Sequence, residues 1–392
     1  MNSEWPTVPL KEFISLQRGH DLPKQDRGDG DVPVMGASGV SGYHDTAKCS
    51  GPGVIIGRSG AIGEVAYQPN DYWPLNTSLY VTDFKGNDER FVYYALSTLH
   101  LKRFDSGSVQ PMLNRNYITD VPVPCPSIDV QESIADTLGT LDDKIEHNHK
   151  VNQTLDSIAS ALFESWFVNY DPFDEMKQSG KGQIPSNFEV DYLPELMEIV
   201  LGGTPKSDIN RYYGGDVMWA KAKAVSQVDE PFISATEKTI TQEGLEESSA
   251  ELVPMGTTVI TARGTVGETA LTPKEMATNQ TCYGLIPHNY EEKYFLYYLV
   301  TSLIRRLKSR SHGTVFDTIN MSTLREQEII LPPQDIRRKF DTTVEPMMDM
   351  ILNNQQENRA LTEVRETLHQ PLITGKVRPK EVDLEVAGTR RE

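Results

Sequence analysis

The chain has 392 residues, of which 38% are hydrophobic and 24% are charged, and its formal net charge is −18. This length exceeds the usual range of a single domain, so we expect two or three domains, and the composition is that of an ordinary globular protein. No apolar run reaches the roughly 18 residues of a membrane span, which excludes a transmembrane helix, and the acidic balance argues against nucleic-acid binding by a uniformly basic surface.

The sequence begins with MNSEWPTVPLKEF, which lacks the basic and apolar regions of a secretory signal, so we expect a cytoplasmic protein. Short β-type runs such as GVIIG and SLYVTDF then alternate with turn residues, and only DERFVYYALSTLHLKRF has a helical pattern. We therefore predict a mixed α+β domain over residues 1–126. Cys49, Cys125 and Cys282 have no disulfide or metal-ligand spacing, and we interpret them as small buried side chains.

Residues 127–174 change to a helical pattern. Between Asp129 and Val168, apolar residues recur at steps of three and four, and they are Ile134, Leu138, Leu141, Ile145, Leu155, Ile158 and Leu162. This stripe predicts a helix of about 40 residues, or roughly 60 Å, which is long enough to act as a spacer. Asn148 and Asn152 interrupt the stripe. In a seam between helices they would set the register, and the alternative is an exposed polar face.

The second half of the chain repeats the first. A polar, Gly- and Ser-containing linker is predicted at 175–190, followed by a second α+β domain at 191–333, a second long helix at 334–375 and a tail at 376–392. At a spacing of 204 residues, GRSGAIGEVA corresponds to TARGTVGETA, and FVYYAL corresponds to FLYYLV. The second helix has the matching stripe Phe340, Val344, Met347, Ile351, Leu361, Val364 and Leu368, with Asn354 and Asn358 as interruptions. We therefore predict two homologous domains in tandem, whose helices pack on each other.

The duplicated glycine-rich turn bears on the kind of site. It lacks the GxxxxGK[ST] pattern of a phosphate loop and the GxGxxG spacing of a dinucleotide site. The chain also lacks an Asn/Asp-Pro-Pro-aromatic methyltransferase tetrad, since Leu331 precedes the prolines of ILPPQD. The glycines permit close approach of the backbone, and Arg58 and Arg263 supply one arginine per copy for a phosphate or a guanine edge. We interpret the turn as a DNA-contact loop. A hairpin turn whose glycines supply positive φ is the alternative, and it is compatible with DNA contact.

This layout resembles one known family, the DNA-specificity subunits of type I restriction-modification enzymes. The resemblance covers essentially the whole chain and rests on GRSGAIGEVA, on PVPCPSIDVQESIADTLGTLDDKIEHN and on the doubled order of domain and helix. It implies an α+β fold with two tandem target recognition domains separated by two long antiparallel coiled-coil-like helices. It also implies a non-catalytic subunit in which each domain reads one half of a bipartite double-stranded DNA target.

The resemblance further implies partners and a cellular location. Methyltransferase subunits, two in number, and restriction/translocase subunits would assemble on this chain in the cytoplasm of a bacterium or archaeon. S-adenosylmethionine, ATP and Mg²⁺ would bind to those subunits, and no cofactor or metal ion is expected on this chain. The alternative class is a protein- or peptide-binding scaffold with duplicated arms, which the acidic charge favours.

Polar residues in matching loops are the candidate DNA contacts, because amide, hydroxyl and basic side chains bind base edges and phosphate oxygens. The candidates are Arg58, Ser59, Asn76, Thr77, Ser108, Gln110 and Asn114 in the first copy and Lys221, Lys223, Arg263, Asn279, Gln280, Thr314, Thr318 and Asn320 in the second. Lys221 and Lys223 are expected on one face of a strand. The alternatives are turn or helix-capping roles for the polar residues and a solvated pair for the lysines.

Three aromatic residues near the end of the first long helix, Phe163, Trp166 and Phe167, are candidates for partner binding. Large aromatic side chains often anchor interfaces, so we expect them to contact the methyltransferase partner. Packing against the adjoining domain is the alternative.

Overall fold

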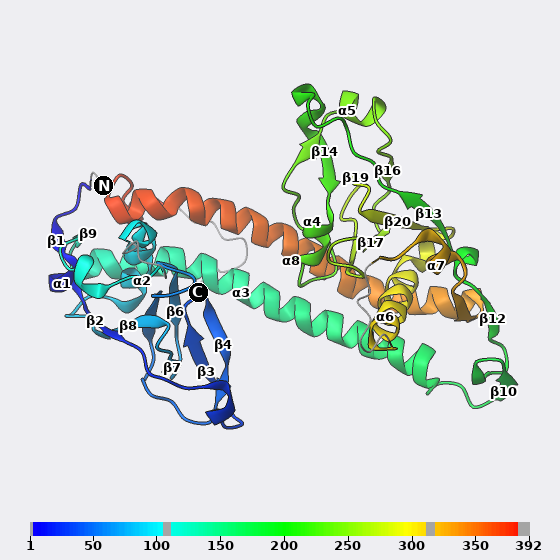
Figure 1. The fold of residues 1–392 in the computed structure, drawn as a ribbon, viewed down its shortest axis with the longest axis horizontal. Helices are drawn as coiled ribbons and strands as arrows, with labels where there is room; N and C mark the ends of the chain where they lie inside the picture. The colour runs from blue at the N-terminus through cyan, green and yellow to red at the C-terminus, as the bar shows by residue number, and fades with distance from the viewer. Residues whose placement is uncertain (1–2, 105–110, 311–317, 383–392) are drawn as a thin grey trace. The chain divides into compact units, whose positions relative to one another are not determined.

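The structure, a computed structural model, describes residues 3–104, 111–310 and 318–382 (Figure 1). The chain forms two compact units, of which the first comprises Met1–Lys144 with Leu361–Glu392 and the second comprises Ile145–Ala360. Each of the two long helices therefore contributes residues to both units. None of the helices in the described ranges is both long and apolar enough to span a membrane.

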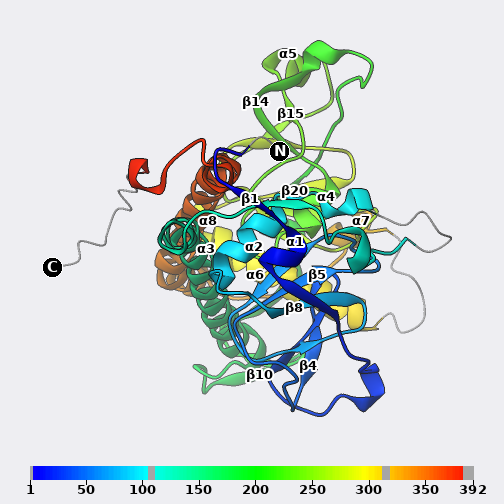
Figure 2. The same cartoon turned by 90° about the vertical axis from the view of Figure 1, so that its left-hand side faces the viewer.

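The first unit contains a four-stranded sheet, a three-stranded sheet and a strand pair. In hydrogen-bonding order, the four-stranded sheet consists of β2 (Ser15–Arg18), β8 (Ser78–Asp83), β5 (Gly53–Gly57) and β6 (Val65–Gln68). The three-stranded sheet consists of β4 (Gly39–His44), β3 (Val32–Gly36) and β7 (Trp73–Pro74). The strand pair is β1 (Thr7–Pro9) with β9 (Pro122–Pro124). A short helix, α1 (Leu10–Phe13), follows β1. The helix α2 (Glu89–Ser97) lies between the larger sheet and the long helix α3 (Ile128–Glu164), where Phe91 and Val92 are fully buried (Figure 2).

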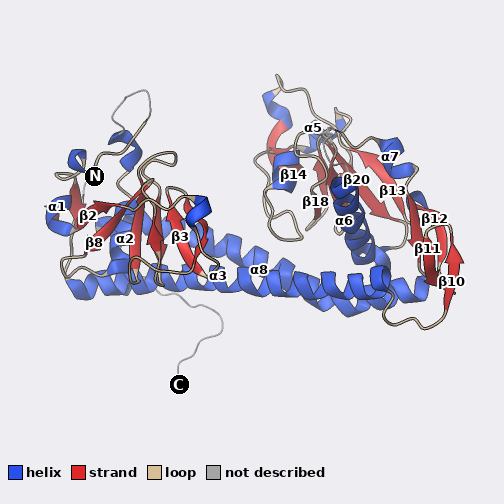
Figure 3. Ribbon diagram, turned by 60° about the horizontal axis from the view of Figure 1, so that its bottom comes forward, coloured by secondary structure: helices blue, strands red, loops and turns tan. Residues whose placement is uncertain are grey.

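The second unit repeats this topology with additions. One four-stranded sheet consists of β13 (Met197–Leu201), β20 (Cys282–Pro287), β17 (Thr258–Thr261) and β18 (Thr269–Leu271). A second consists of β15 (Thr239–Ile240), β14 (Tyr213–Ala220), β19 (Met276–Thr278) and β16 (Leu252–Val253). The strand pair is β12 (Glu189–Tyr192) with β21 (Glu328–Leu331). The helices are α4 (Ala222–Ser226), α5 (Gln242–Glu246), α6 (Lys293–Arg310), α7 (Met321–Arg325) and the long α8 (Gln334–Thr374) (Figure 3). Because the larger sheets share one strand order, the predicted pair of homologous α+β domains is confirmed.

The predicted linker at 175–190 is structured. Strands β10 (Met176–Ser179) and β11 (Gly182–Pro185) form a hairpin, and Ile184 and Phe188 are buried in the core of the second unit (Figure 3). The Gly- and Ser-containing composition reflects the turn of this hairpin, where Gly182 has a φ of 102°. The segment predicted as a linker therefore contains a β-hairpin and packs on the second unit.

The two long helices run antiparallel. In the second unit, Asn148 Nδ2 donates to Asn358 Oδ1 at 2.8 Å, and Asn354 Nδ2 donates to Asn152 Oδ1 at 2.8 Å. Residue numbers thus rise along α3 as they fall along α8. Asn148, Asn152 and Asn358 are buried, so the predicted polar positions in a helix seam are confirmed and the exposed-face alternative is wrong.

The apolar stripe is only partly buried. Its first half packs against the domain that precedes each helix, as shown by the fully buried Ile134 and Phe340, but Ile158 is 47% exposed and Val364 is 40% exposed. The buried face of α3 has moved by one position to Ala159, which lies about 100° further around the helix. The stripe prediction was therefore wrong at Ile158 and Val364.

Asp341 on α8 caps the N-terminal end of α6. Its carboxylate accepts hydrogen bonds from the backbone N–H of Tyr294 at 2.9 Å and of Phe295 at 2.7 Å, and the residue is 5% exposed. Burial raises the pKa of Asp341 to about 7, although the two backbone bonds act to lower it. Because this pKa lies above the value of 3.8 for a free side chain, the contribution of Asp341 to stability is full below about pH 4 and is lost as the pH rises through about 7.

We expect Asp341→Asn to lower the free energy of unfolding by about 1–3 kcal/mol, because the amide NH₂ cannot accept the second backbone bond. The loss should be larger at pH 5 than at pH 8, since the wild-type contribution declines over that interval. Urea denaturation of both proteins at the two pH values measures it. Asp349→Asn, at an exposed position of α8, is the control, and an equal loss at both pH values would contradict the raised pKa of Asp341.

Candidate nucleic-acid interface

The duplicated glycine-rich segment is a hairpin turn in both units, between β5 and β6 and between β17 and β18. Gly60 and Gly63 have φ values of 88° and 78°, and Gly264 and Gly267 have 82° and 76°. A Cβ atom on Gly63 would lie 2.6 Å from the backbone nitrogen of Lys102. The positive φ values confirm the hairpin alternative. The close backbone approach that Gly63 permits is to another segment of the same chain, at Lys102.

Backbone hydrogen bonds align the two copies. The N–H of Arg58 donates to the carbonyl of Thr77 at 2.9 Å, and the N–H of Ala262 donates to the carbonyl of Thr281 at 2.7 Å. Ala262 is therefore the counterpart of Arg58, and Arg263 lies one position further along. This agrees with the spacing of 204 residues found in the sequence, so the one arginine of each copy stands at a different position of the turn.

The same register pairs Asn76 with Gln280. Asn76 Nδ2 donates to the Asp21 carboxylate, and Gln280 Oε1 accepts from the Thr204 hydroxyl. Aligning NTSLY with NQTCY by identity instead pairs Asn76 with Asn279, which is 8% exposed. Its Oδ1 accepts hydrogen bonds from the backbone N–H and the hydroxyl of Thr281 at 3.1 and 2.6 Å, so the turn-stabilising alternative describes Asn279.

A cavity of about 690 Å³ opens beside this loop in the first unit, and we call it the arginine cavity. It is lined by Gln17, Arg18, Gly19, His20, Asp21, Arg58, Leu79, Met112, Leu113, Asn114 and Arg115. The half-buried Arg58 donates from Nη1 to the carbonyl of Asn76 at 3.2 Å and from Nη2 to Met112 Sδ at 2.7 Å. Burial, and then the neighbouring charge of Arg18, lower the pKa of the Arg58 guanidinium.

Two arginines of this cavity were missed by the sequence prediction. Arg18 ends β2 and is exposed, and Arg115 is exposed and donates from Nη1 to the carbonyl of Leu16 at 3.1 Å. Arg115 directly follows the candidate Asn114, so a basic residue beside a polar loop was the available signal. Arg18 had no such signal, because only the fold places the end of β2 beside the turn.

The remaining candidates of the first unit have local structural roles. Asn114 Oδ1 accepts from the N–H of Asn116 at 3.0 Å at the start of a 3₁₀ turn, as the helix-capping alternative predicted. Ser59 and Thr77 are half-buried, and the N–H of Ser59 donates to the carbonyl of Thr77 at 3.1 Å. These residues support the turn that holds Arg58.

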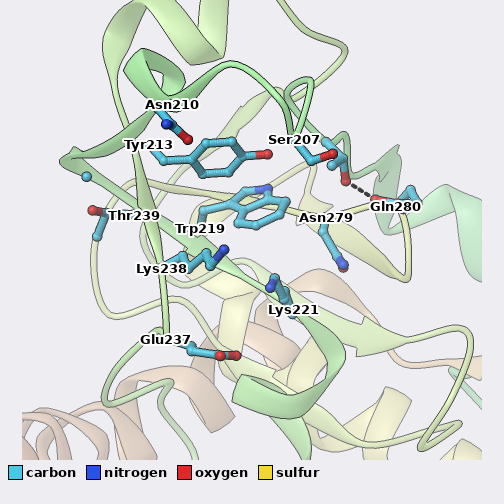
Figure 4. Close-up of a pocket in the computed structure, with 12 residues that line it drawn as sticks. Ser207, Asn210, Tyr213, Trp219, Lys221, Glu237, Lys238, Thr239, Asn279 and Gln280 are labelled. Carbon is cyan, nitrogen blue, oxygen red and sulfur yellow. Dashed lines mark hydrogen bonds between the residues drawn. The ribbon is translucent and has the colours of Figure 1, made fainter.

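The second unit has a cavity of about 700 Å³, which we call the aromatic cavity (Figure 4). Its lining residues are Thr204, Ser207, Asn210, Tyr213, Gly214, Trp219, Lys221, Glu237, Lys238, Thr239, Asn279 and Gln280. The Lys221 ammonium lies 5.3 Å from the centre of the Trp219 ring, and that of Lys238 lies 5.5 Å from the Tyr213 ring. The cavity thus combines two ammonium groups with the exposed amide of Gln280.

Lys221 and Lys223 do not share a face of a strand. Strand β14 ends at Ala220, Lys221 is the N-cap of α4, and Lys223 lies within α4 and is exposed. A smaller cavity of about 370 Å³ is nevertheless lined by both lysines and by Lys238. The strand prediction was wrong, and the two side chains still reach a common hollow.

The loop after the second turn holds the last candidates. The N–H of Ile319 donates to the carbonyl of Ala262 at 3.1 Å, as that of Leu113 does to Arg58 at 2.8 Å. This bond places the exposed Thr318 beside the turn, and Asn320 is exposed at the N-terminal end of α7. Three candidates, Ser108, Gln110 and Thr314, lie outside the described residues.

The aromatic residues proposed for partner binding pack largely inward. Phe163 is 2% exposed and Phe167 is 8% exposed, and both rings contact Phe295 and Phe340 in the core of the second unit. Packing against the adjoining domain therefore describes these two residues, and the partner-binding prediction was wrong for them. Trp166 is half-buried against Phe340, so its role in partner binding stays a prediction.

Comparison with known proteins agrees with the duplicated plan. The family model for the type I restriction modification DNA specificity domain matches residues 2–157 and 185–363. The chain is 26% identical over 363 residues to the type I restriction enzyme MjaIX specificity subunit of Methanocaldococcus jannaschii, covering 84% of this chain and 78% of that protein. It is 27% identical over 329 residues to the HindI specificity subunit of Haemophilus influenzae, covering 68% and 71%.

The fold is similar to a solved structure of the same kind. The crystal structure of the S subunit of a type I restriction-modification system from M. genitalium superposes with a TM-score of 0.63 at 16% identity. The match covers 95% of this chain and 96% of that one. Within the described residues, no group of His, Cys, Asp and Glu side chains is arranged to hold a metal ion.

Proposed function

Because the chain belongs to the family of type I restriction-modification DNA specificity subunits, we propose that its two units each read one half of a bipartite sequence in double-stranded DNA. The observation that carries this proposal is that each unit has a cavity beside the same pair of corresponding positions. Asp21 lines the arginine cavity and is hydrogen-bonded to Asn76. Thr204 lines the aromatic cavity and is hydrogen-bonded to Gln280, the counterpart of Asn76. Each unit thus has a cavity beside the same bonded pair of positions, and the two cavities are lined by different side chains.

The charges of the cavities fit this role despite the net charge of −18. Arg18, Arg58 and Arg115 line the first cavity, and Lys221 and Lys238 line the second. Much of the acidic excess lies elsewhere, since residues 127–190 contain 12 acidic and 4 basic residues. Local basic groups can therefore meet phosphates and base edges while the protein as a whole stays acidic.

A salt titration tests DNA binding. The full chain is titrated with a fluorescent duplex that contains its target at several salt concentrations. The logarithm of the binding constant should fall linearly with the logarithm of the salt concentration, because lysine and arginine side chains that neutralise phosphates displace the counterions of the DNA. An affinity independent of salt would instead favour a protein- or peptide-binding scaffold.

Members of this family work with the other subunits of a restriction-modification complex, and we propose specific partners for this chain. Two methyltransferase subunits and the restriction/translocase subunits would assemble on it in the cytoplasm of a bacterium or archaeon. S-adenosylmethionine, ATP and Mg²⁺ would bind to those subunits. The recognition subunit itself has no catalytic role.

Two exposed apolar positions support the docking of two copies of one partner. Ile158 on α3 in the second unit and Val364 on α8 in the first unit are 206 residues apart and correspond to each other in the repeat. They are 47% and 40% exposed, and each continues the apolar stripe of its helix at a position that the fold leaves uncovered. We propose that each contacts one methyltransferase subunit.

We expect Ile158→Asp to reduce the number of bound methyltransferase subunits from two to one, and the double variant with Val364→Asp to bind none. A buried carboxylate without a partner costs about 3–5 kcal/mol, which would weaken each contact by roughly 10²- to 10³-fold. Native mass spectrometry of the purified complex measures the stoichiometry. Val40→Asp, at a 51% exposed position on β4, is the control, and a double variant that still binds two copies would contradict this docking surface.

A further inference from the structure

We propose that Arg58 reads a guanine in the half-site bound by the first unit, and that the second unit reads its half-site with different chemistry. The inference rests on the proposed function, because it assigns a base to a cavity that faces DNA under that proposal. It goes further by naming the specificity-determining residue and the base.

The Arg58 guanidinium is oriented before any ligand binds. The carbonyl of Asn76 and the sulfur of Met112 accept from its two terminal nitrogens at 3.2 and 2.7 Å. Asn76 is itself held by a bond from its side-chain amide to Asp21. Other N–H donors of the guanidinium remain for a ligand, and a side chain that is already ordered loses little entropy on binding.

The surroundings of Arg58 favour an electron-rich ligand. Arg18 and Arg115 line the same cavity, and Asp21 carries the only carboxylate among the described lining residues. That carboxylate is already bonded to Asn76. A ligand with hydrogen-bond acceptors would therefore relieve the repulsion between the positive charges.

The shape of the site favours a base edge over a phosphate for Arg58. The planar guanidinium is half-buried beside the apolar side chains of Leu79 and Leu113, whereas Arg18 and Arg115 are exposed at the rim. A planar guanidinium fits a phosphate as well as O6 and N7 of guanine, but a phosphate is reached by exposed side chains, so the half-buried position of Arg58 in a partly apolar hollow favours the base edge. The geometry therefore assigns the base contact to Arg58 and leaves phosphate contacts to the rim.

The second unit lacks this device. Ala262 occupies the position of Arg58, so no guanidinium can project from that point of the turn. Its cavity instead presents the Lys221 and Lys238 ammonium groups and the Gln280 amide. The two half-sites should accordingly differ. A guanine read by two parallel hydrogen bonds from an arginine at this position is expected only in the half-site of the first unit.

The first test is made in cells. The full chain is expressed with its methyltransferase subunits, and the methylated sites are mapped for wild type, Arg58→Lys and Arg263→Lys. Lysine keeps the positive charge but lacks the two parallel N–H donors of the guanidinium. One guanine position in one half-site should become degenerate in Arg58→Lys and stay unchanged in Arg263→Lys. A wild-type complex that methylates no bipartite motif would refute the proposed function itself, whereas a bipartite motif left unchanged by Arg58→Lys would overturn only the role of Arg58.

The second test identifies the atom that is read. The guanine is replaced by 7-deazaguanine, which keeps base pairing but lacks the N7 acceptor, and duplex binding is measured for the same variants. Wild type should lose about 5- to 150-fold in affinity, as expected for a bidentate contact, and Arg58→Lys should lose little more. Equal losses in both proteins would mean that another residue reads N7, and a uniform loss by Arg58→Lys on all duplexes would mean that Arg58 is a phosphate anchor.

Discussion

Replacing Lys221 and Gln280 together by alanine should abolish recognition of one half-site while the other half-site keeps its sequence. Both side chains line the aromatic cavity of the second unit, and the amide of Gln280 occupies the position that Asn76 holds in the first unit. Each lost base contact weakens discrimination by about 1–3 kcal/mol, so the double variant should lose roughly 30- to 10⁴-fold of its preference at that half-site.

Mapping of methylated sites in cells that express the complex measures this effect. The matched control is the double variant Lys177→Ala and Gln178→Ala, which removes the same residue types from exposed positions of the β10–β11 hairpin. It should leave both half-sites intact. If the cavity variant instead loses affinity equally on every duplex, Lys221 and Gln280 bind phosphates and do not read bases.

The duplicated plan could be predicted from the sequence, because glycines with positive φ, proline-bounded helices and apolar periodicity are local signals that survive divergence. The register of the glycine turn could be predicted too, at a spacing of 204 residues, but the register of the segment that follows it could not. Matching NTSLY with NQTCY by identity pairs Asn76 with Asn279, but the backbone bonds pair Thr77 with Thr281. Since successive residues near a strand point to opposite faces, this shift of one residue separates an inward-facing amide from an exposed one.

The contacts between the two long helices could likewise be predicted only in part. Buried asparagines at Asn148 and Asn152 were predictable, because polar residues interrupting an apolar stripe are typical of register-setting positions. Their further partner was not: Glu230, from a loop far away in the sequence, accepts from Asn152 Nδ2 at 3.0 Å and contacts His149 Nδ1 at 2.8 Å. Long-range contacts of this kind depend on the fold as a whole and leave no local pattern.

The cavities were the least predictable feature. Arg58 was singled out because it lies in a conspicuous turn, but Arg18 and the Tyr213–Trp219 pair come from segments without any motif. Phe163 and Phe167 illustrate the converse, since an aromatic cluster at a helix end is equally typical of a core and of an interface. Only burial distinguishes the two, and burial is a property of the tertiary structure.

Lengthening both long helices at the boundary between the units should widen the unread gap between the two half-sites. Because α3 and α8 each contribute to both units, and the units meet in sequence at Lys144–Ile145 and at Ala360–Leu361, residues inserted at these two points lengthen the helices between the recognition surfaces. Four residues add about 6 Å and seven add about 10 Å at ~1.5 Å per residue. With ~3.4 Å per base pair, the gap should grow by about two and three base pairs, respectively.

The phase of each insertion provides the control. Four or seven residues come close to whole turns at ~3.6 residues per turn, so the apolar faces of each helix on the two sides of the insertion stay roughly aligned. Two residues rotate one part of the helix by about 200° relative to the other, which turns the apolar faces away from each other and should abolish target methylation. Mapping of methylated sites for the three insertions distinguishes the outcomes. Unchanged half-sites with a gap that grows with helix length would establish that the helices measure DNA, and a fully active four-residue variant with the original gap would show that they do not.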